Sequence, residues 1–158
     1  LYNKLKKVKS VSLRYFSVYG PKEEHKGKFA NVVSQFLWRM MRDESPIIFG
    51  DGTQTRDFIY VDDVVEANLL AMEKLLEEEI SYEIINVGTG KSKNFNEVVS
   101  ILNKTLKKDI KPVYVENPIE NYVMHTLADT TKAEKLLGFK AKVEFEDGVK
   151  RLVEYYGH

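Results

Sequence analysis

Cysteine is absent from the 158-residue chain, which excludes disulfide bonds and thiolate metal sites and fits a cytoplasmic location. No apolar run approaches the roughly 18 to 20 residues that a membrane-spanning helix needs. Neither sign of charge is in excess, because 24 basic residues balance 24 acidic ones. We therefore expect neither nucleic acid nor a membrane as a partner, and any anionic ligand must be held by local cations.

Metal ligands and nucleotide signatures are also scarce. His25 and His125 have no partners at the spacing of a metal site, so we expect no bound metal. The segment 88–92 (GTGKS) has neither the six-position spacing of a Walker motif nor the third glycine of a dinucleotide fingerprint. We therefore assign no nucleotide-binding role to this glycine segment.

The chain does contain enough apolar material for a core, with 43% hydrophobic and 11% aromatic residues. Apolar periodicity predicts helices over 29–42, from Asp62 or Asp63 to the acidic run 77–79, from Asn94 or Asn96 to 106, over 130–137 and over 146–156. β-branched and aromatic runs predict strands over 11–18, 46–49, 57–61, 82–87 and 111–115. Helices that alternate with short strands indicate an α/β chain.

The chain begins as though partway through a fold. Residues 1–9 have the leucine and lysine spacing of the last turns of a helix, and they lead directly into the strand over 11–18. The strands are too few for a self-sufficient doubly wound domain. Because neighbouring strands would normally cover the strand over 11–18, we expect its edge and apolar faces to be exposed and the chain to self-associate.

Polar side chains gather in two clusters. In the first, 14–28, a strand runs into a loop with hydroxyl, imidazole and ammonium groups, and ligands of open α/β sheets lie beyond such strand ends. A solvated lysine-rich loop is the alternative. In the second, 50–58, Arg56 stands beside a glycine turn, where its guanidinium can grip a diphosphate bidentately. Alternatively, Arg56 simply pairs with Asp57 or Asp62.

Four ordered segments, LRYFSVYGP, GDGTQTRDFIYVDDV, INVGTG and ADTTKAEKLLGF, resemble the C-terminal half of the extended short-chain dehydrogenase/reductase family. Members of that family include UDP-galactose 4-epimerase, dTDP-glucose dehydratase and ADP-heptose epimerase. The resemblance covers essentially the whole chain. Within the family, GPKEEHKG and DESPIIF are most similar to ADP-glycero-manno-heptose 6-epimerase.

The resemblance implies that 1–158 is the substrate-binding lobe of an extended Rossmann-type enzyme, with residues 1–20 holding the end of the catalytic helix and one late strand of the Rossmann sheet. The N-terminal dinucleotide-binding half and the catalytic tyrosine and lysine would precede residue 1. The Tyr-x-x-x-Lys spacing at Tyr2 and Lys6 is then a coincidence. The parent enzyme would oxidise its sugar transiently by hydride transfer to NAD or NADP. This chain alone would bind no cofactor and show no turnover.

Site residues carry over by the same resemblance. Lys26 would be a second acid/base group, with a plain surface lysine as the alternative, and the cofactor would be bordered by Tyr15, Phe16, Val18 and Lys26. The nucleotide-diphosphate sugar would contact Ser17, Lys28, Gln35, Phe49, Gly50, Asp51, Gly52, Arg56 and Tyr122. Three of these depart from the expected pattern. Asparagine is usual in the family at Ser17, and the heptose epimerases have a serine and a histidine at Lys28 and Gln35.

The identity of the nucleotide stays open. The segment 118–122 lacks the arginine of the Arg-Gly-Asp-like element that UDP-sugar enzymes carry, whereas Tyr122 resembles a tyrosine of heptose epimerases. This disfavours a UDP ligand, although a UDP-glucose/galactose 4-epimerase or a sugar-nucleotide dehydratase is an alternative parent. From another class, the chain could be a non-catalytic nucleotide-sugar-binding module or a structural partner that completes another subunit.

Overall fold

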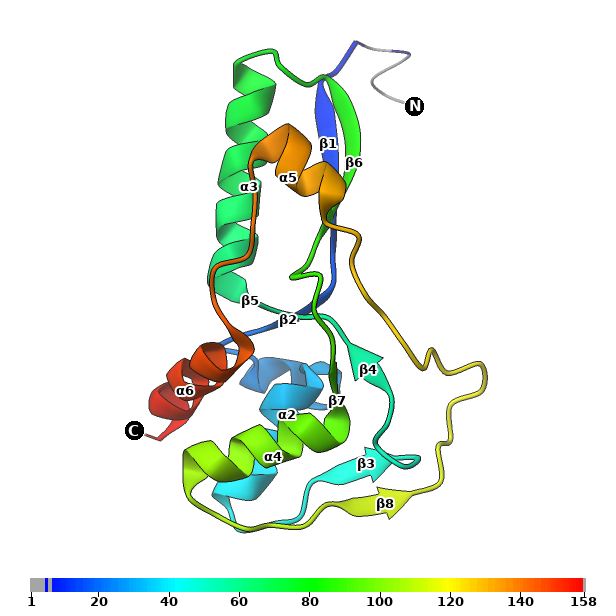
Figure 1. The fold of residues 1–158 in the computed structure, drawn as a ribbon, viewed down its shortest axis with the longest axis vertical. Helices are drawn as coiled ribbons and strands as arrows, with labels where there is room; N and C mark the ends of the chain where they lie inside the picture. Colours follow the sequence, from blue (N-terminus) through cyan, green and yellow to red (C-terminus); the bar gives the residue numbers. More distant parts are fainter. Residues whose placement is uncertain (1–4, 6, 158) are drawn as a thin grey trace.

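The computed structural model describes residue 5 and residues 7–157, so Tyr2, Lys6 and most of the helix predicted over 1–9 lie outside the described residues. The molecule is elongated, with two packed bodies along its long axis (Figure 1). The upper body contains β1 (Ser10–Tyr15), α3 (Val61–Leu76), β6 (Tyr82–Val87) and α5 (Thr131–Leu137). The lower body contains η1 (Glu24–Phe29), α2 (Val32–Met41), β3 (Ile47–Phe49), β4 (Thr55–Arg56), β7 (Lys93–Asn94), α4 (Phe95–Leu106), β8 (Val113–Val115) and α6 (Phe145–Tyr156). Between them lie β2 (Ser17–Tyr19) and β5 (Phe58–Tyr60).

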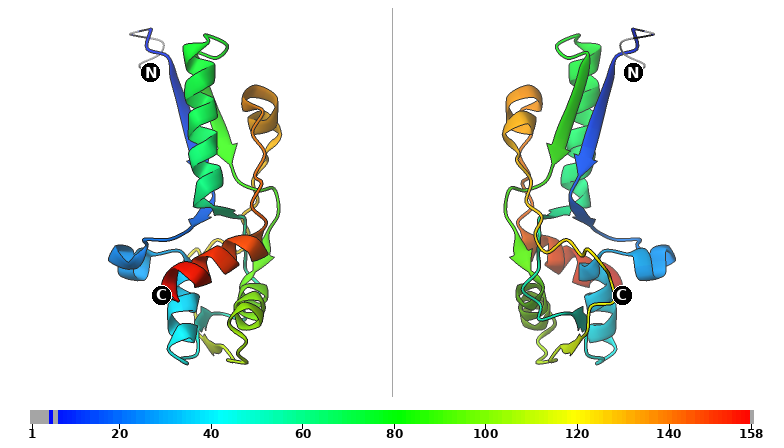
Figure 2. Two further views of the ribbon diagram at one scale, coloured as in Figure 1. Left: turned by 90° about the vertical axis from the view of Figure 1, so that its left-hand side faces the viewer. Right: turned by 90° about the vertical axis from the view of Figure 1, so that its right-hand side faces the viewer.

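The upper body is built on the parallel pair β1–β6. Helix α3 covers one face of this pair, and α5 lies beside β6 (Figure 2). Alternate residues of β6, Ile85 and Val87, are fully buried beneath the helices, whereas Ser12 and Arg14 on β1 are exposed. The β1–β6 pair is therefore covered by helices on one face only.

The prediction of a single strand over 11–18 is wrong in one respect, because at Phe16 the chain stops pairing with β6 and begins to pair with β5. The Phe16 N–H donates to the Val87 carbonyl of β6 (3.0 Å), and the next N–H, of Ser17, donates to the Asp57 carbonyl (2.9 Å). From there β2 pairs in parallel with β5. One extended run is thus divided between the two bodies and joins them.

The lower body packs α2, α4 and α6 around an aromatic centre. The ring of Tyr19 lies 5.3 Å from Phe145, 5.5 Å from Tyr60 and 6.4 Å from Phe58, measured between centroids. Apolar residues of α2 and α4 close the same core. The pairs β3–β8 (parallel) and β4–β7 (antiparallel) border this body.

The helix ends follow the sequence in part. Asn94, one of the two caps predicted for this helix, is the N-cap of α4 and forms a capping box with Glu97. Asp62 and Asp63 do not cap α3, because the N-cap position is Tyr60 and both acids lie in the first turn, where the helix dipole favours them. The buried Asp63 carboxylate accepts instead from the backbone N–H groups of residues 142 and 143, both at 3.1 Å.

Because the phenol of Tyr19 is buried, we expect the fold to lose stability at alkaline pH. Its hydroxyl donates to the Phe145 carbonyl (3.2 Å), and burial raises the pKa of Tyr19 well above its ordinary value of 10.0. A raised folded-state pKa leaves stability intact below about pH 10 and reduces it above, by up to about 1.4 kcal/mol per pH unit for one group. Urea unfolding between pH 9 and 11 should show a gentler loss for Tyr19→Phe than for the wild type, and equal slopes would contradict this role.

Candidate functional site

The exit of the first strand lies beside the arginine-containing cluster. Ser17 is bonded to Asp57 through the backbone and stands opposite Phe58 in the β2–β5 ladder. Arg56 directly precedes this pairing. The two polar clusters of the sequence therefore meet at the junction of the two bodies.

Arg56 is free of ion pairs among the residues that the structure describes. Its Nη1 donates to the carbonyls of Thr55 (2.7 Å) and Met124 (3.1 Å), and its Cζ lies 5.1 Å from the Tyr122 ring and 5.7 Å from the Phe95 ring. The alternative pairing with a neighbouring aspartate is wrong, because the Asp57 carboxylate has other donors and Asp62 pairs with Arg151. The guanidinium is thus held in place by carbonyls and rings while its positive charge stays available.

A rigid glycine turn precedes Arg56 along the chain. Gly50 and Gly52 have φ values of 76° and 82°, which favour glycine, and a β-carbon on Gly52 would clash with the Asn96 amide. The Asp51 carboxylate accepts from the Thr53 hydroxyl (2.7 Å) and N–H (3.0 Å), and these bonds lower the pKa of Asp51. The turn is therefore fixed before any ligand arrives.

Gln54 supports this turn from inside and was not among the predicted site residues. It is 1% exposed, and its Nε2 donates to the Phe49 carbonyl (2.8 Å). Its Oε1 is buried with no hydrogen-bond partner among the described residues. Phe49 itself stays partly exposed at the end of β3. The only sequence signal for Gln54 was its place inside the GDGTQTRDF segment.

Asp57 is the second residue that sequence reasoning undervalued. Its fully buried carboxylate accepts from the Thr89 N–H (2.8 Å), the Thr89 hydroxyl (2.7 Å), the Gly90 N–H (2.9 Å) and the Ala128 N–H (3.1 Å). A β-carbon on Gly88 would lie 2.9 Å from Asp57 Oδ2. The segment 88–92 thus binds a carboxylate of its own chain. Through these bonds Asp57 holds that segment and the backbone at Ala128 next to Arg56.

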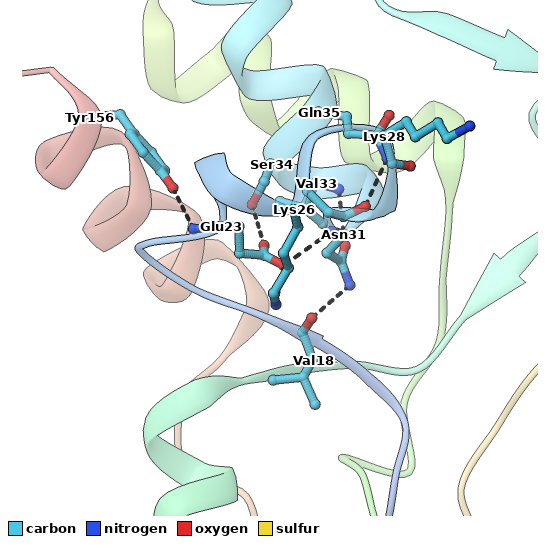
Figure 3. Close-up of polar contacts among 10 residues, drawn as sticks. Val18, Glu23, Lys26, Lys28, Asn31, Val33, Ser34, Gln35 and Tyr156 are labelled. Carbon is cyan, nitrogen blue, oxygen red and sulfur yellow. Dashed lines mark hydrogen bonds and ion pairs between the residues drawn. The ribbon is translucent and has the colours of Figure 1, made fainter.

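The remaining predicted residues form a second group around η1 and α2. Lys26 Nζ lies 3.0 Å from the Glu23 carboxylate, and the Gln35 amide donates to the Ala30 carbonyl (2.7 Å) (Figure 3). Lys28 lies over the Phe29 ring at 5.2 Å. Lys28 and Gln35 line an open groove of about 600 Å³ together with Glu24, Gly27, Trp38, Arg39, Met41, Arg42 and Tyr156.

The strand exit connects these groups. The Val18 carbonyl accepts from the Asn31 side chain (2.9 Å), which in turn caps α2 (Figure 3). Tyr15 is half-exposed, and its hydroxyl donates to Asn68 of α3 (2.9 Å). Of the predicted residues, Ser17, Arg56, Tyr122 and the glycine turn therefore belong to one region, and Lys26, Lys28 and Gln35 to another.

A more enclosed cavity of about 160 Å³ lies elsewhere, beneath the segment 88–93 and α6, and contains none of the predicted site residues. Four of its charged residues form two ion pairs, Lys91 with Glu144 (2.8 Å) and Lys93 with Glu146 (3.3 Å). The described residues contain no group of three or more potential metal ligands. In the same part of the chain, every helix is too short or too polar to cross a bilayer.

Comparison with known proteins gives the family. The model of the NAD dependent epimerase/dehydratase family matches residues 1–88, and the chain belongs to that family. A putative UDP-glucose 4-epimerase of Methanocaldococcus jannaschii is 41% identical over 155 residues, which cover 98% of this chain and 48% of that protein. The chain thus spans about half the length of the curated relatives that it matches first.

Solved structures agree with this α/β fold. The UDP-glucose 4-epimerase of Thermotoga maritima, solved with UDP-glucose, superposes with a TM-score of 0.88 at 40% identity, over 99% of this chain and 48% of that one. The ADP-L-glycero-D-manno-heptose-6-epimerase of Helicobacter pylori superposes with a TM-score of 0.82 at 32% identity, over 94% and 44%. Relatives that act on different sugar nucleotides therefore share this architecture.

Proposed function

We propose that this chain is the nucleotide-sugar-binding part of an NAD-dependent nucleotide-sugar epimerase. The observation that carries the proposal is Arg56, whose guanidinium is fixed beside a rigid glycine turn and the Tyr122 ring without a carboxylate partner. A diphosphate needs such a preset cation, and a planar guanidinium matches its oxygens bidentately. An aromatic ring at the same place offers a surface for the base or sugar.

The family uses NAD, which supplies the hydride acceptor for transient oxidation of the sugar. The sequence contains no Gly-x-Gly-x-x-Gly fingerprint. In the proposal, a separate N-terminal half supplies the cofactor site, the tyrosine and the lysine, and this part binds and orients the nucleotide sugar.

A UDP-hexose is the first ligand that we propose. The UDP-glucose 4-epimerase relatives are 40% and 41% identical over nearly the whole chain, whereas the ADP-heptose epimerase is 32% identical over a shorter share. This favours UDP over the ADP-heptose suggested by the sequence motifs. ADP-heptose remains the second candidate, because Tyr122, the residue that resembles those epimerases, lies against Arg56.

Calorimetric titration tests the proposal. We expect the purified chain to bind UDP-glucose more tightly than ADP-, GDP- or dTDP-sugars, because it is 41% identical to a putative UDP-glucose 4-epimerase and 40% identical to a solved one. With NAD added, the chain should show no epimerisation. Epimerisation by the chain alone would contradict its assignment as a binding part. Failure to bind any nucleotide sugar would favour the structural-partner alternative.

We also propose that the chain self-associates through the face of the β1–β6 pair that no helix covers. Among the described strands β1 pairs with β6 alone, and Tyr82 and Ile84 expose 44% and 41% of their surface. Sedimentation velocity should show concentration-dependent dimers, and Ile84→Lys should shift them toward monomer because it places a charge on that face. Ile119→Lys, at an exposed position on another segment, is the matched control. A strictly monomeric wild type would refute this proposal.

A further inference from the structure

A buried carboxylate stands behind the lysine-rich loop. Glu23 is 4% exposed, and its carboxylate accepts hydrogen bonds from Ser34 Oγ (2.5 Å), Lys26 Nζ (3.0 Å) and Asn31 N (3.1 Å) (Figure 3). Its own N–H donates to the Tyr156 hydroxyl (3.2 Å). One residue therefore fastens the loop to α2, to the cap of α2 and to α6.

The charge of this anchor is balanced by Lys26. The Glu23 side chain is 5% exposed and the Lys26 side chain 47% exposed, so the ion pair spans the border between core and solvent. Ser34 and Asn31 contribute neutral donors, and a buried carboxylate without a counter-charge is costly. The ammonium of Lys26 is therefore held at one place instead of moving freely in solvent.

Gly27 separates this lysine from the next one. Its φ of 51° and ψ of −122° interrupt η1, in a region of backbone conformation that only glycine adopts readily. Lys26 points back to Glu23, whereas the Lys28 side chain points away from it (Figure 3). Lys28 is one of the residues that line the groove. Among the described residues no carboxylate pairs with Lys28, which lies over the Phe29 ring. The two lysines are thus a matched pair, one anchored and one not.

We propose that Glu23 is a positioning residue that fixes the Lys26 ammonium, so that those of its N–H groups that do not bond Glu23 are held ready to donate to oxygens of a nucleotide sugar bound beside the loop 24–30. The ligand part of this inference rests on the proposed function. The pairing also changes the role expected for Lys26. An acid/base group would have to leave Glu23 and abandon a buried carboxylate, whereas a fixed cation keeps the pair intact.

Amine labelling followed by mass spectrometry tests the pairing in the intact chain. The ratio of the Lys26 to the Lys28 labelling rate should rise about threefold or more in Glu23→Gln, because the ammonium loses its partner. Glu23→Asp keeps the charge but is too short to reach Lys26 and Ser34 together, and it should raise the same ratio. Glu24→Gln, at the exposed neighbour, should leave the ratio unchanged, and circular dichroism checks that each variant is folded.

UDP-glucose then tests the ligand part. Saturating UDP-glucose should slow the labelling of Lys26 in the wild type. An unchanged labelling ratio in both Glu23 variants would overturn the positioning role. Unslowed labelling of Lys26 while calorimetry records bound UDP-glucose would overturn its contact with ligand. If UDP-glucose does not bind the wild type at all, the proposed function fails, while the labelling ratio still decides whether Glu23 fixes Lys26.

Discussion

Replacement of Asp57 by alanine should lower the free energy of unfolding by about 3 to 5 kcal/mol. The buried carboxylate accepts four hydrogen bonds from Thr89, Gly90 and Ala128. Alanine removes the acceptor from these donors, of which the Ala128 N–H is buried, and opens a cavity where the two bodies meet. Urea denaturation followed by circular dichroism measures the effect.

Asp109→Ala is the matched control for this experiment. Asp109 pairs with Lys111 at the surface, where its side chain is 81% exposed, so the free energy of unfolding should change by less than about 0.5 kcal/mol. The loss of unfolding free energy for Asp57→Asn should lie between those for Asp57→Ala and Asp109→Ala, because the amide keeps one acceptor oxygen and the shape of the side chain. A loss below about 1 kcal/mol for Asp57→Ala would show that water replaces the carboxylate and that Asp57 is not the fastening of this region.

Replacement of Arg56 by lysine should weaken the binding of UDP-glucose by about 2 kcal/mol, or roughly thirtyfold. Lysine keeps the positive charge but loses the bidentate fork, the guanidinium contacts to the Thr55 and Met124 carbonyls and the guanidinium contact with the Tyr122 ring. Titration calorimetry of the folded variant measures the loss. Uridine, which has no diphosphate, should show a much smaller difference between variant and wild type.

Arg42→Lys controls for the general loss of a guanidinium. Arg42 pairs with Glu44 at the surface, in the groove region and not at the glycine turn, so its replacement should leave UDP-glucose affinity unchanged. Equal losses in the two variants would indicate a nonspecific charge effect. Unchanged affinity in Arg56→Lys would remove the diphosphate contact from the proposal.

Local patterns in the sequence predicted most of the helices and the approximate positions of the strands other than β4 and β7. The capping residue of α4 and the end of α5 at residue 137 are examples, because both depend on neighbours within a few positions. The break at Phe16 was not predictable in this way. It depends on β5 and β6, which lie dozens of positions away and offer two different sets of backbone partners.

The candidate site shows the same division. The glycine turn and Arg56 are recognisable from residue types, since positive φ and a guanidinium are local properties. The burial of Glu23 and Asp57 is not, because each carboxylate sits in a network built from distant segments. The sequence therefore predicts Lys26 as an acid/base group or a surface lysine, although the fold pairs it with the buried carboxylate of Glu23.

Mapping of amide and guanidinium NMR signals during a UDP-glucose titration locates the nucleotide-sugar site. We expect the largest shifts at Gly50, Gly52, the Arg56 side chain and Tyr122. Shifts centred instead on the enclosed cavity at Lys91 and Glu144, with Arg56 unaffected, would contradict it.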